Sequence, residues 1–130
     1  MATEHWVLVV EDDEGLRYAF TRALEKVGLK VDAAASGRDA VDLLNREGSK
    51  YCCATLDMLL PSVHGSSLIS HIARTRANLS VVAITGYPDR VLFADQADRH
   101  IVKAIFVKPV EPSDVAAYVA SRCERPPLGA

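Results

Sequence analysis

The stretch ATLDMLLPSVHG, residues 54–65, joins an apolar run typical of a buried strand to a carboxylate at its end. Asp57 closes the run, and Pro61 and Gly65 mark a loop behind it. An unpaired buried charge is costly, so Asp57 needs partners from elsewhere in the chain. This order of strand, carboxylate and loop predicts a site at the end of a strand.

Composition indicates a soluble, globular chain of 130 residues, long enough for one domain with a sizeable core. Hydrophobic residues make up 49% and charged residues 25%, which excludes a disordered chain. The net charge of −2 gives no electrostatic reason to expect binding to nucleic acid or to an anionic membrane. No apolar stretch reaches the length of a membrane span.

The three cysteines do not form a disulfide framework, and two of them, Cys52 and Cys53, are adjacent. A reducing cytosol is the simplest interpretation, so we expect a cytoplasmic protein. The adjacent pair is interpreted as two small apolar strand residues rather than as a redox or metal site.

Alternation of short apolar runs with amphipathic segments predicts an α/β fold. The runs lack strict polar alternation, which suits strands covered on both faces; they are residues 6–10, 31–35, 52–56, 80–85 and 104–108. Helical spacing follows each run, at 14–27, 37–47, 66–76, 89–99 and from 112 onward. This order predicts a doubly wound parallel sheet with right-handed crossovers.

Individual residues set the expected helix ends. Asp13 is placed to cap the first helix and Gly28 to end it. Pro112 suits the first position of the last helix. Trp6 and Phe20 are expected in the core.

Polar groups follow several of the expected strands. Glu11 and Asp12 come after the first, Asp57 ends the third, Thr85 the fourth and Lys108 the fifth. The carboxyl ends of parallel strands meet at one edge of a sheet, where ligands bind. Crowded carboxylates repel one another unless a cation intervenes, and oxygen ligands suit Mg²⁺. The set fits phosphoryl transfer to a carboxylate, with Asp57 as the acceptor.

Several of these polar residues also have a simpler structural explanation. Thr85 by itself is equally explained by strand propensity, and Lys108 by itself by a surface lysine. The four histidines have no metal-ligand spacing and are expected to be surface residues; they are His5, His64, His71 and His100.

Four stretches together resemble the response-regulator receiver domain of two-component signalling (CheY-like). In chain order they are VLVVEDDE, LDMLLPSVHG, VVAITGYPD and IFVKPVEPSDV, and the similarity covers about residues 5–124. The resemblance implies a five-stranded (βα)5 flavodoxin-like sheet of strand order 2-1-3-4-5. It implies a receiver domain over 1–124, with 125–130 as a C-terminal tail or the start of a linker.

The resemblance also assigns roles to the site residues. Mg²⁺ would be bound by Asp12 and Asp57, by Glu11 through water and by the backbone carbonyl of Leu59. Asp57 would be the phosphoacceptor.

Two further residues would act on the phosphoryl group after transfer: Thr85 would follow it and Lys108 would pair with it. The Lys108–Pro109 peptide is expected to be cis, a bond type that is uncommon in proteins.

The chain departs from the family pattern at three places. Ile105 stands where the family often has an aromatic switch residue, and Phe106, one position on, should face the opposite side of the strand. Leu59 and Tyr87 occupy positions that tune dephosphorylation, and neither orients an attacking water well, so we predict slow loss of phosphate. Glu11 replaces an aspartate.

The resemblance implies a signalling module that accepts a phosphoryl group from a histidine kinase or phosphotransfer protein. It would switch an unknown output partner, or a homodimer, through the face formed by the fourth helix, fifth strand and fifth helix. It would not be an enzyme in the turnover sense. Two alternatives are a receiver-like interaction module that is not regulated by phosphorylation, and a phosphohydrolase, which lacks its second acid at Leu59.

Overall fold

A computed structural model describes residues 4–59, 65–75, 78–87 and 96–123, and within them the predicted strand–helix alternation is confirmed. The strands are β1 (Trp6–Val10), β2 (Lys30–Ala34), β3 (Tyr51–Asp57), β4 (Ser80–Thr85) and β5 (Val102–Val107). The helices are α1 (Glu14–Lys26), α2 (Gly37–Glu47), α3 (Gly65–Thr75), α4 (Gln96–Ile101) and α5 (Pro112–Cys123), with a 3-10 turn, η1 (Gly48–Lys50). All strand pairs are parallel, in the expected order β2-β1-β3-β4-β5.

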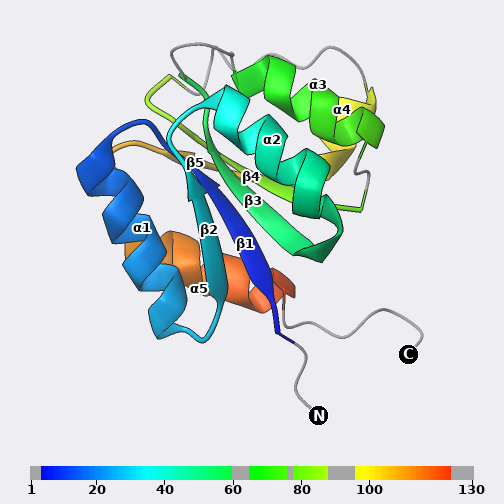
Figure 1. Cartoon of the computed structure of the whole chain (residues 1–130). Helices are drawn as coiled ribbons and strands as arrows, with labels where there is room; N and C mark the ends of the chain where they lie inside the picture. Colours follow the sequence, from blue (N-terminus) through cyan, green and yellow to red (C-terminus); the bar gives the residue numbers. More distant parts are fainter. Residues whose placement is uncertain (1–3, 60–64, 76–77, 88–95, 124–130) are drawn as a thin grey trace.

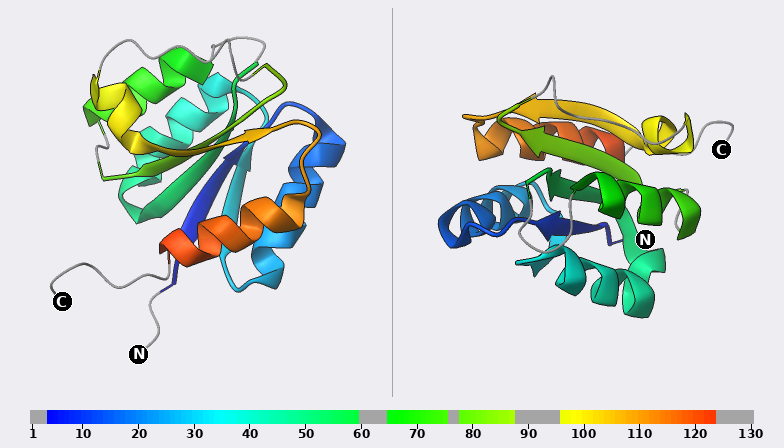
Figure 2. Two further views of the ribbon diagram at one scale, coloured as in Figure 1. Left: turned by 180° about the vertical axis from the view of Figure 1, so that it is seen from behind. Right: turned by 90° about the horizontal axis from the view of Figure 1, so that it is seen from above.

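The sheet lies between two layers of helices (Figures 1 and 2). Helices α1 and α5 cover one face, and α2, α3 and α4 cover the other. Successive strand residues point to opposite faces, so the strands feed two cores. Leu8 and Val10 of β1 join the core under α2, α3 and α4, whereas Val7 and Val9 join the core under α1 and α5. Burial on both faces explains why the strand sequences do not alternate.

Helix ends follow the predicted residues with one exception. Gly28 has a positive φ of 92° just after α1, and Pro112 is the first residue of α5. Asp13 does occupy the N-cap position of α1, but its side chain makes no capping hydrogen bond, so that part of the prediction is wrong. The capping bond is seen instead at α2, where the Asp39 N–H donates to Ser36 Oγ over 3.1 Å.

Some predicted boundaries and burials differ from the structure. The fourth helix was expected over 89–99; residues 89–95 lie outside the described part, and the helix seen runs Gln96–Ile101. Phe20 is buried as predicted, but Trp6 is half-buried at the edge of the core, with Lys50 Nζ 3.8 Å from its ring centroid. His64 and the predicted tail 125–130 also lie outside the described residues.

The cysteine prediction is wrong in one respect. Cys52 and Cys123 are joined by a disulfide between β3 and the end of α5, whereas Cys53 is the buried apolar strand residue expected. The two partners stand 71 positions apart, so local sequence gave no sign of the pairing. Within the described ranges, no helix has both the length and the apolar character that a membrane crossing requires.

Candidate functional site

The carboxyl edge of the sheet collects the predicted site residues. Asp57 and Thr85 are the last residues of the adjacent strands β3 and β4, and Glu11 follows β1 directly. Lys108 follows β5, and its backbone N–H donates to the Thr85 carbonyl over 2.8 Å. The parallel topology therefore delivers an acid, a hydroxyl and an amine from distant segments to one place.

Asp57 is buried, with 4% of its surface exposed, and both of its oxygens have donors. Lys108 Nζ donates to Oδ2 over 3.1 Å, and the Leu59 backbone N–H donates to Oδ1 over 3.0 Å. These partners stabilise the charge that the sequence left unexplained.

Three carboxylates meet here. One oxygen from each of Glu11, Asp12 and Asp57 lies within 4.8 Å of the others. Glu11 is 1% exposed; its Oε2 accepts from the Asp13 N–H over 3.2 Å, while its buried Oε1 has no hydrogen-bond partner. Lys108 Nζ lies 3.8 Å from that Oε1, too far for a good hydrogen bond. An orphaned carboxylate oxygen within an all-oxygen cluster fits a hard divalent cation such as Mg²⁺.

The pKa values of Glu11 and Lys108 both reflect burial and the neighbouring charges of the cluster. Burial, and then the neighbouring Asp57 carboxyl, raise the pKa of Glu11 to about 8. Burial by itself would lower the pKa of Lys108, but the hydrogen bond to Asp57 and the charges of Glu11 and Asp12 raise it instead. Lys108 is therefore a fixed cation at neutral pH.

Arg17 is a residue of this region that sequence reasoning missed. From α1 its Nη1 donates to the Glu11 carbonyl over 3.0 Å and lies 3.4 Å from the Asp12 carbonyl. It thereby braces the backbone of the acidic loop. The sequence gave one indication of this role, which is that Arg17 closely follows four acidic residues. Contacts to backbone carbonyls cannot be seen in a sequence.

Gly65 also has a structural role that the sequence marked only as a turn. Its N–H donates to the Met58 carbonyl over 3.2 Å, and a Cβ on Gly65 would lie 2.6 Å from Met58 Cα. The start of α3 therefore approaches the backbone behind Asp57 so closely that only glycine fits.

Thr85 and the residues around it lie as the topology requires. Thr85 is buried, and its Oγ1 accepts from the Tyr87 N–H over 3.0 Å. The Lys108–Pro109 peptide is cis, as predicted.

On β5, Ile105 is 42% exposed, whereas Phe106 packs inward with its ring centroid 6.0 Å from that of Tyr118. The expectation that these two neighbours face opposite sides is confirmed.

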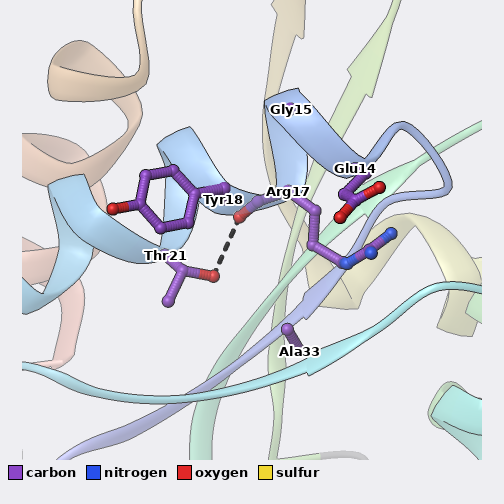
Figure 3. A pocket seen from close by; sticks show the side chains of 6 residues that line it. All are labelled: Glu14, Gly15, Arg17, Tyr18, Thr21 and Ala33. Atoms are coloured by element: carbon purple, nitrogen blue, oxygen red, sulfur yellow. Dashed lines mark hydrogen bonds between the residues drawn. The ribbon is translucent and has the colours of Figure 1, made fainter.

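A pocket of about 560 Å³ lies beside the site, between α1 and β2 (Figure 3). Glu14, Tyr18 and Thr21 contribute to its wall from α1, and Ala33 contributes from β2. Arg17 lines it as well, while Asp57, Thr85 and Lys108 do not, so the pocket is a neighbour of the carboxylate cluster and not part of it.

The chain is similar in sequence to several known signalling proteins. The chain is 26% identical over 119 residues to the sensor kinase CckA of Brucella abortus, covering 92% of this chain and 12% of that protein. It is 33% identical over 101 residues to the transcriptional regulatory protein TcrA of Mycobacterium tuberculosis, covering 75% and 39% respectively. The chain thus spans well under half the length of these curated relatives.

Solved structures show the same fold. A CheY-like response regulator receiver domain from Methanospirillum hungatei superposes with a TM-score of 0.80 at 22% identity, over 94% of this chain and 95% of that one. The family model described as "Response regulator receiver domain" matches residues 7–120. The chain therefore belongs to the response regulator receiver domain family of two-component signalling.

Proposed function

We propose that this receiver domain accepts a phosphoryl group on Asp57 from a histidine kinase or phosphotransfer protein, with Mg²⁺ as cofactor, and thereby switches the binding of a partner. One observation carries the proposal: a buried carboxylate 3.1 Å from Lys108 Nζ shares its strand edge with two more carboxylates. That combination of nucleophile, fixed cation and oxygen cluster is what transfer of a phosphoryl group requires.

The residues divide the chemistry among them. An oxygen of Asp57 attacks phosphorus, the bond from phosphorus to the donor's histidine nitrogen breaks, and the histidine leaves with its electron pair. Lys108 already contacts the Asp57 carboxylate and balances the negative charge of the phosphoryl oxygens. Thr85, at the end of the neighbouring strand, offers its hydroxyl to one of them.

Mg²⁺ has a defined set of candidate ligands: Asp12, Asp57, Glu11 through water and the Leu59 carbonyl. When bound, the ion supplies charge neutralisation at the phosphoryl oxygens and removes the repulsion among the carboxylates. Arg17 contacts the backbone carbonyls of Glu11 and Asp12, so it orients the ligand side chains through the backbone and is not itself a ligand.

Switching is assigned to the face of α4, β5 and α5. Ile105 and Val107 expose 42% and 48% of their surface on β5, which is a large apolar exposure for an edge strand. These residues suit contact with an output partner or with a second copy after phosphorylation. Neither nucleic acid nor membrane is proposed as a direct partner, and the domain turns over no substrate.

Two other functions fit the site less well. A receiver-like module without phosphorylation would not need Asp57, Thr85 and Lys108 together at one edge. A phosphohydrolase with an Asp nucleophile would need an acid at Leu59, whose side chain is 56% exposed and apolar.

The test is incubation of the purified chain with Mg²⁺ and acetyl phosphate. We expect an acyl phosphate, seen as a mass increase labile to hydroxylamine, on the wild type and none on Asp57→Asn. Ser66→Asn, on the first turn of α3, is a control that leaves the carboxylate in place. Equal labelling of Asp57→Asn, or steady hydrolysis of phosphoesters, would refute the proposal.

We also propose that residues 1–124 form the domain, that 125–130 are a tail or the start of a linker, and that the protein works in the cytoplasm. The family match over 7–120 supports the first. Most thiols stay reduced in a reducing cytoplasm, so the Cys52–Cys123 bond would be exposed to reductants there.

A further inference from the structure

The disulfide lies at the end of the sheet opposite to Asp57. Cys52 is the second residue of β3 and Cys123 is the last residue of α5, with 5.6 Å between their Cα atoms. That separation is within the ordinary range for a bridged pair. The bond connects the strand that carries Asp57 to the helix that ends the described chain.

A bulge in the sheet aims Cys52 at its partner. On a regular strand Cys52 and Cys53 would point to opposite faces. The register of β3 on β1 shifts here: Trp6 pairs with Tyr51 and Val7 pairs with Cys53, which leaves Cys52 between them without a partner in β1. Cys52 consequently packs on the same side as Cys53, under α1 and α5. Re-aiming one side chain is a known effect of such a bulge.

The surroundings favour a bond that opens and closes. Cys52 is half-buried and Cys123 is 8% exposed, so an incoming thiol reaches Cys52 more readily. Cys52 Sγ lies 3.3 Å from the Trp6 carbonyl oxygen. A disulfide sulfur has no hydrogen to donate, so this contact becomes a hydrogen bond only when Cys52 is a thiol. The reduced form therefore has an acceptor already in place.

The fold does not depend on the bond alone. Val115, Ala116 and Val119 bury α5 against the core independently of Cys123. The third cysteine, Cys53, is fully buried, and burial raises the pKa of its thiol to about 12, so it is a poor competitor for exchange.

We propose that Cys52 and Cys123 form a reversible redox site whose reductant is a dithiol, and whose closed state tethers the end of α5 to β3. A thiolate of the dithiol attacks Cys52 Sγ, the sulfur–sulfur bond breaks, and Cys123 leaves as a thiolate that takes a proton. The second thiolate of the dithiol then attacks the mixed disulfide and releases Cys52, which is protonated. Two electrons pass from the dithiol to the protein, and a disulfide oxidant reverses the reaction.

The first experiment titrates the native full chain. It is equilibrated without denaturant in mixtures of reduced and oxidised dithiothreitol, trapped with N-ethylmaleimide and weighed intact. We expect a single change from no adducts to two adducts as the mixture becomes more reducing, with Cys53 labelled only after unfolding. Cys53→Ser should keep the transition, and Cys52→Ser and Cys123→Ser should each abolish it.

Other results would overturn the proposal. Two free thiols at Cys52 and Cys123 under every oxidising mixture would mean that no bond forms. A bond that opens only in denaturant would make it a fixed brace instead of a redox site.

The second experiment measures the tether by amide hydrogen exchange. We expect the last turn of α5 to exchange several-fold faster in the reduced protein than in the oxidised one, and Cys52→Ser to match the reduced protein in both conditions. Exchange that is equal in the two redox states would remove the tether from the proposal. Neither readout needs phosphorylation, so the redox site and the role of Asp57 are tested separately.

Discussion

A single buried carboxylate defines this domain at the residue scale. Lys108 and the Leu59 N–H donate to the two oxygens of Asp57, whereas burial, and then the neighbouring Asp57 carboxyl, raise the pKa of Glu11 to about 8. The site therefore combines Asp57, whose oxygens both have donors, with the orphaned Oε1 of Glu11, which is available to a cation.

Gly65→Ala should disturb the site from outside it. The added Cβ would meet Met58 Cα at 2.6 Å, so the backbone behind Asp57 must shift. We expect a loss of about 1–3 kcal/mol in the free energy of unfolding and a slower phosphorylation of Asp57 by acetyl phosphate. Gly15→Ala in α1, where a Cβ would meet nothing nearer than 3.9 Å, is the control and should stabilise the helix by up to about 1 kcal/mol. Equal behaviour of the two variants in urea denaturation would contradict this view.

Leu59 and Tyr87 should make the phosphorylated state long-lived. Both side chains are exposed, at 56% and 51%, and neither orients a water for attack on the acyl phosphate. Leu59→Asn supplies an amide and should speed the loss of phosphate several-fold, whereas Leu59→Ala should not. The measurement is the decay of the labelled mass after acetyl phosphate is removed. Rapid decay in the wild type would show that another group activates water.

Elements are connected at the opposite end of the sheet by a polar network. The Tyr51 hydroxyl of β3 donates to Asp32 Oδ2 of β2 over 2.6 Å, and Lys50 Nζ of η1 lies 2.9 Å from the same oxygen. Strands β2 and β3 flank β1 without pairing to each other, so this contact fixes their relative position across it. The network lies far along the strands from Asp57 and has a structural role.

Tyr51→Phe should cost stability in a way that depends on pH. Burial by itself would raise the pKa of Asp32, but the bonds from Tyr51 and Lys50 lower it below its ordinary 3.8. A lowered carboxyl pKa contributes stability that is present above 3.8 and is lost as the pH falls through the folded value. We therefore expect a loss of about 1 kcal/mol at pH 7 that shrinks progressively as the pH falls below 3.8.

Urea denaturation of the variant across that pH range is the measurement. Tyr18→Phe is the control, because Tyr18 is 67% exposed on α1 and should be neutral at every pH. A penalty for Tyr51→Phe that stays constant down to the acid transition would show that its source is packing alone.

The molecule as a whole is a sheet whose two ends carry different chemistry. The carboxyl edge gathers Glu11, Asp12 and Asp57, and the other end carries the Cys52–Cys123 bond. Because β3 runs between them, a charge change at one end and a redox change at the other act on the same central strand. The carboxylate cluster joins the ends of β1 and β3, so a cation bound there should hold the strands together.

Mg²⁺ should therefore raise the melting temperature. A cation that binds only the folded chain stabilises it by about 2.7 kcal/mol at a hundredfold excess over its dissociation constant. We expect EDTA to reverse the shift and Asp12→Asn to reduce it, measured by calorimetry with and without MgCl₂. NaCl at the same ionic strength separates binding at the site from screening by salt. A shift of the same size in Asp12→Asn would place the ion elsewhere.

Sequence alone predicted the order of strands and helices and the polar residues that meet at one edge of the sheet. Apolar runs alternating with helical spacing impose a parallel sheet, and parallel strands must bring their carboxyl ends to one edge. The meeting of Asp57, Thr85 and Lys108 follows from that topology, and the helix end at Gly28 follows from local pattern. The cis bond at Pro109 was expected from the resemblance to receiver domains. The first two features depend on local pattern and on a rule of strand connection, so no coordinates were needed to expect them.

Tertiary structure alone decided the contacts that depend on register and on helix placement. The shift between Trp6 and Val7 turns Cys52 toward Cys123, 71 positions away, against the expectation of two apolar strand residues. Arg17 reaches backbone carbonyls, and Gly65 is required by the approach of Met58. Such contacts arise when separate elements pack at one set of distances and rotations, and a local pattern of residue types does not encode those distances.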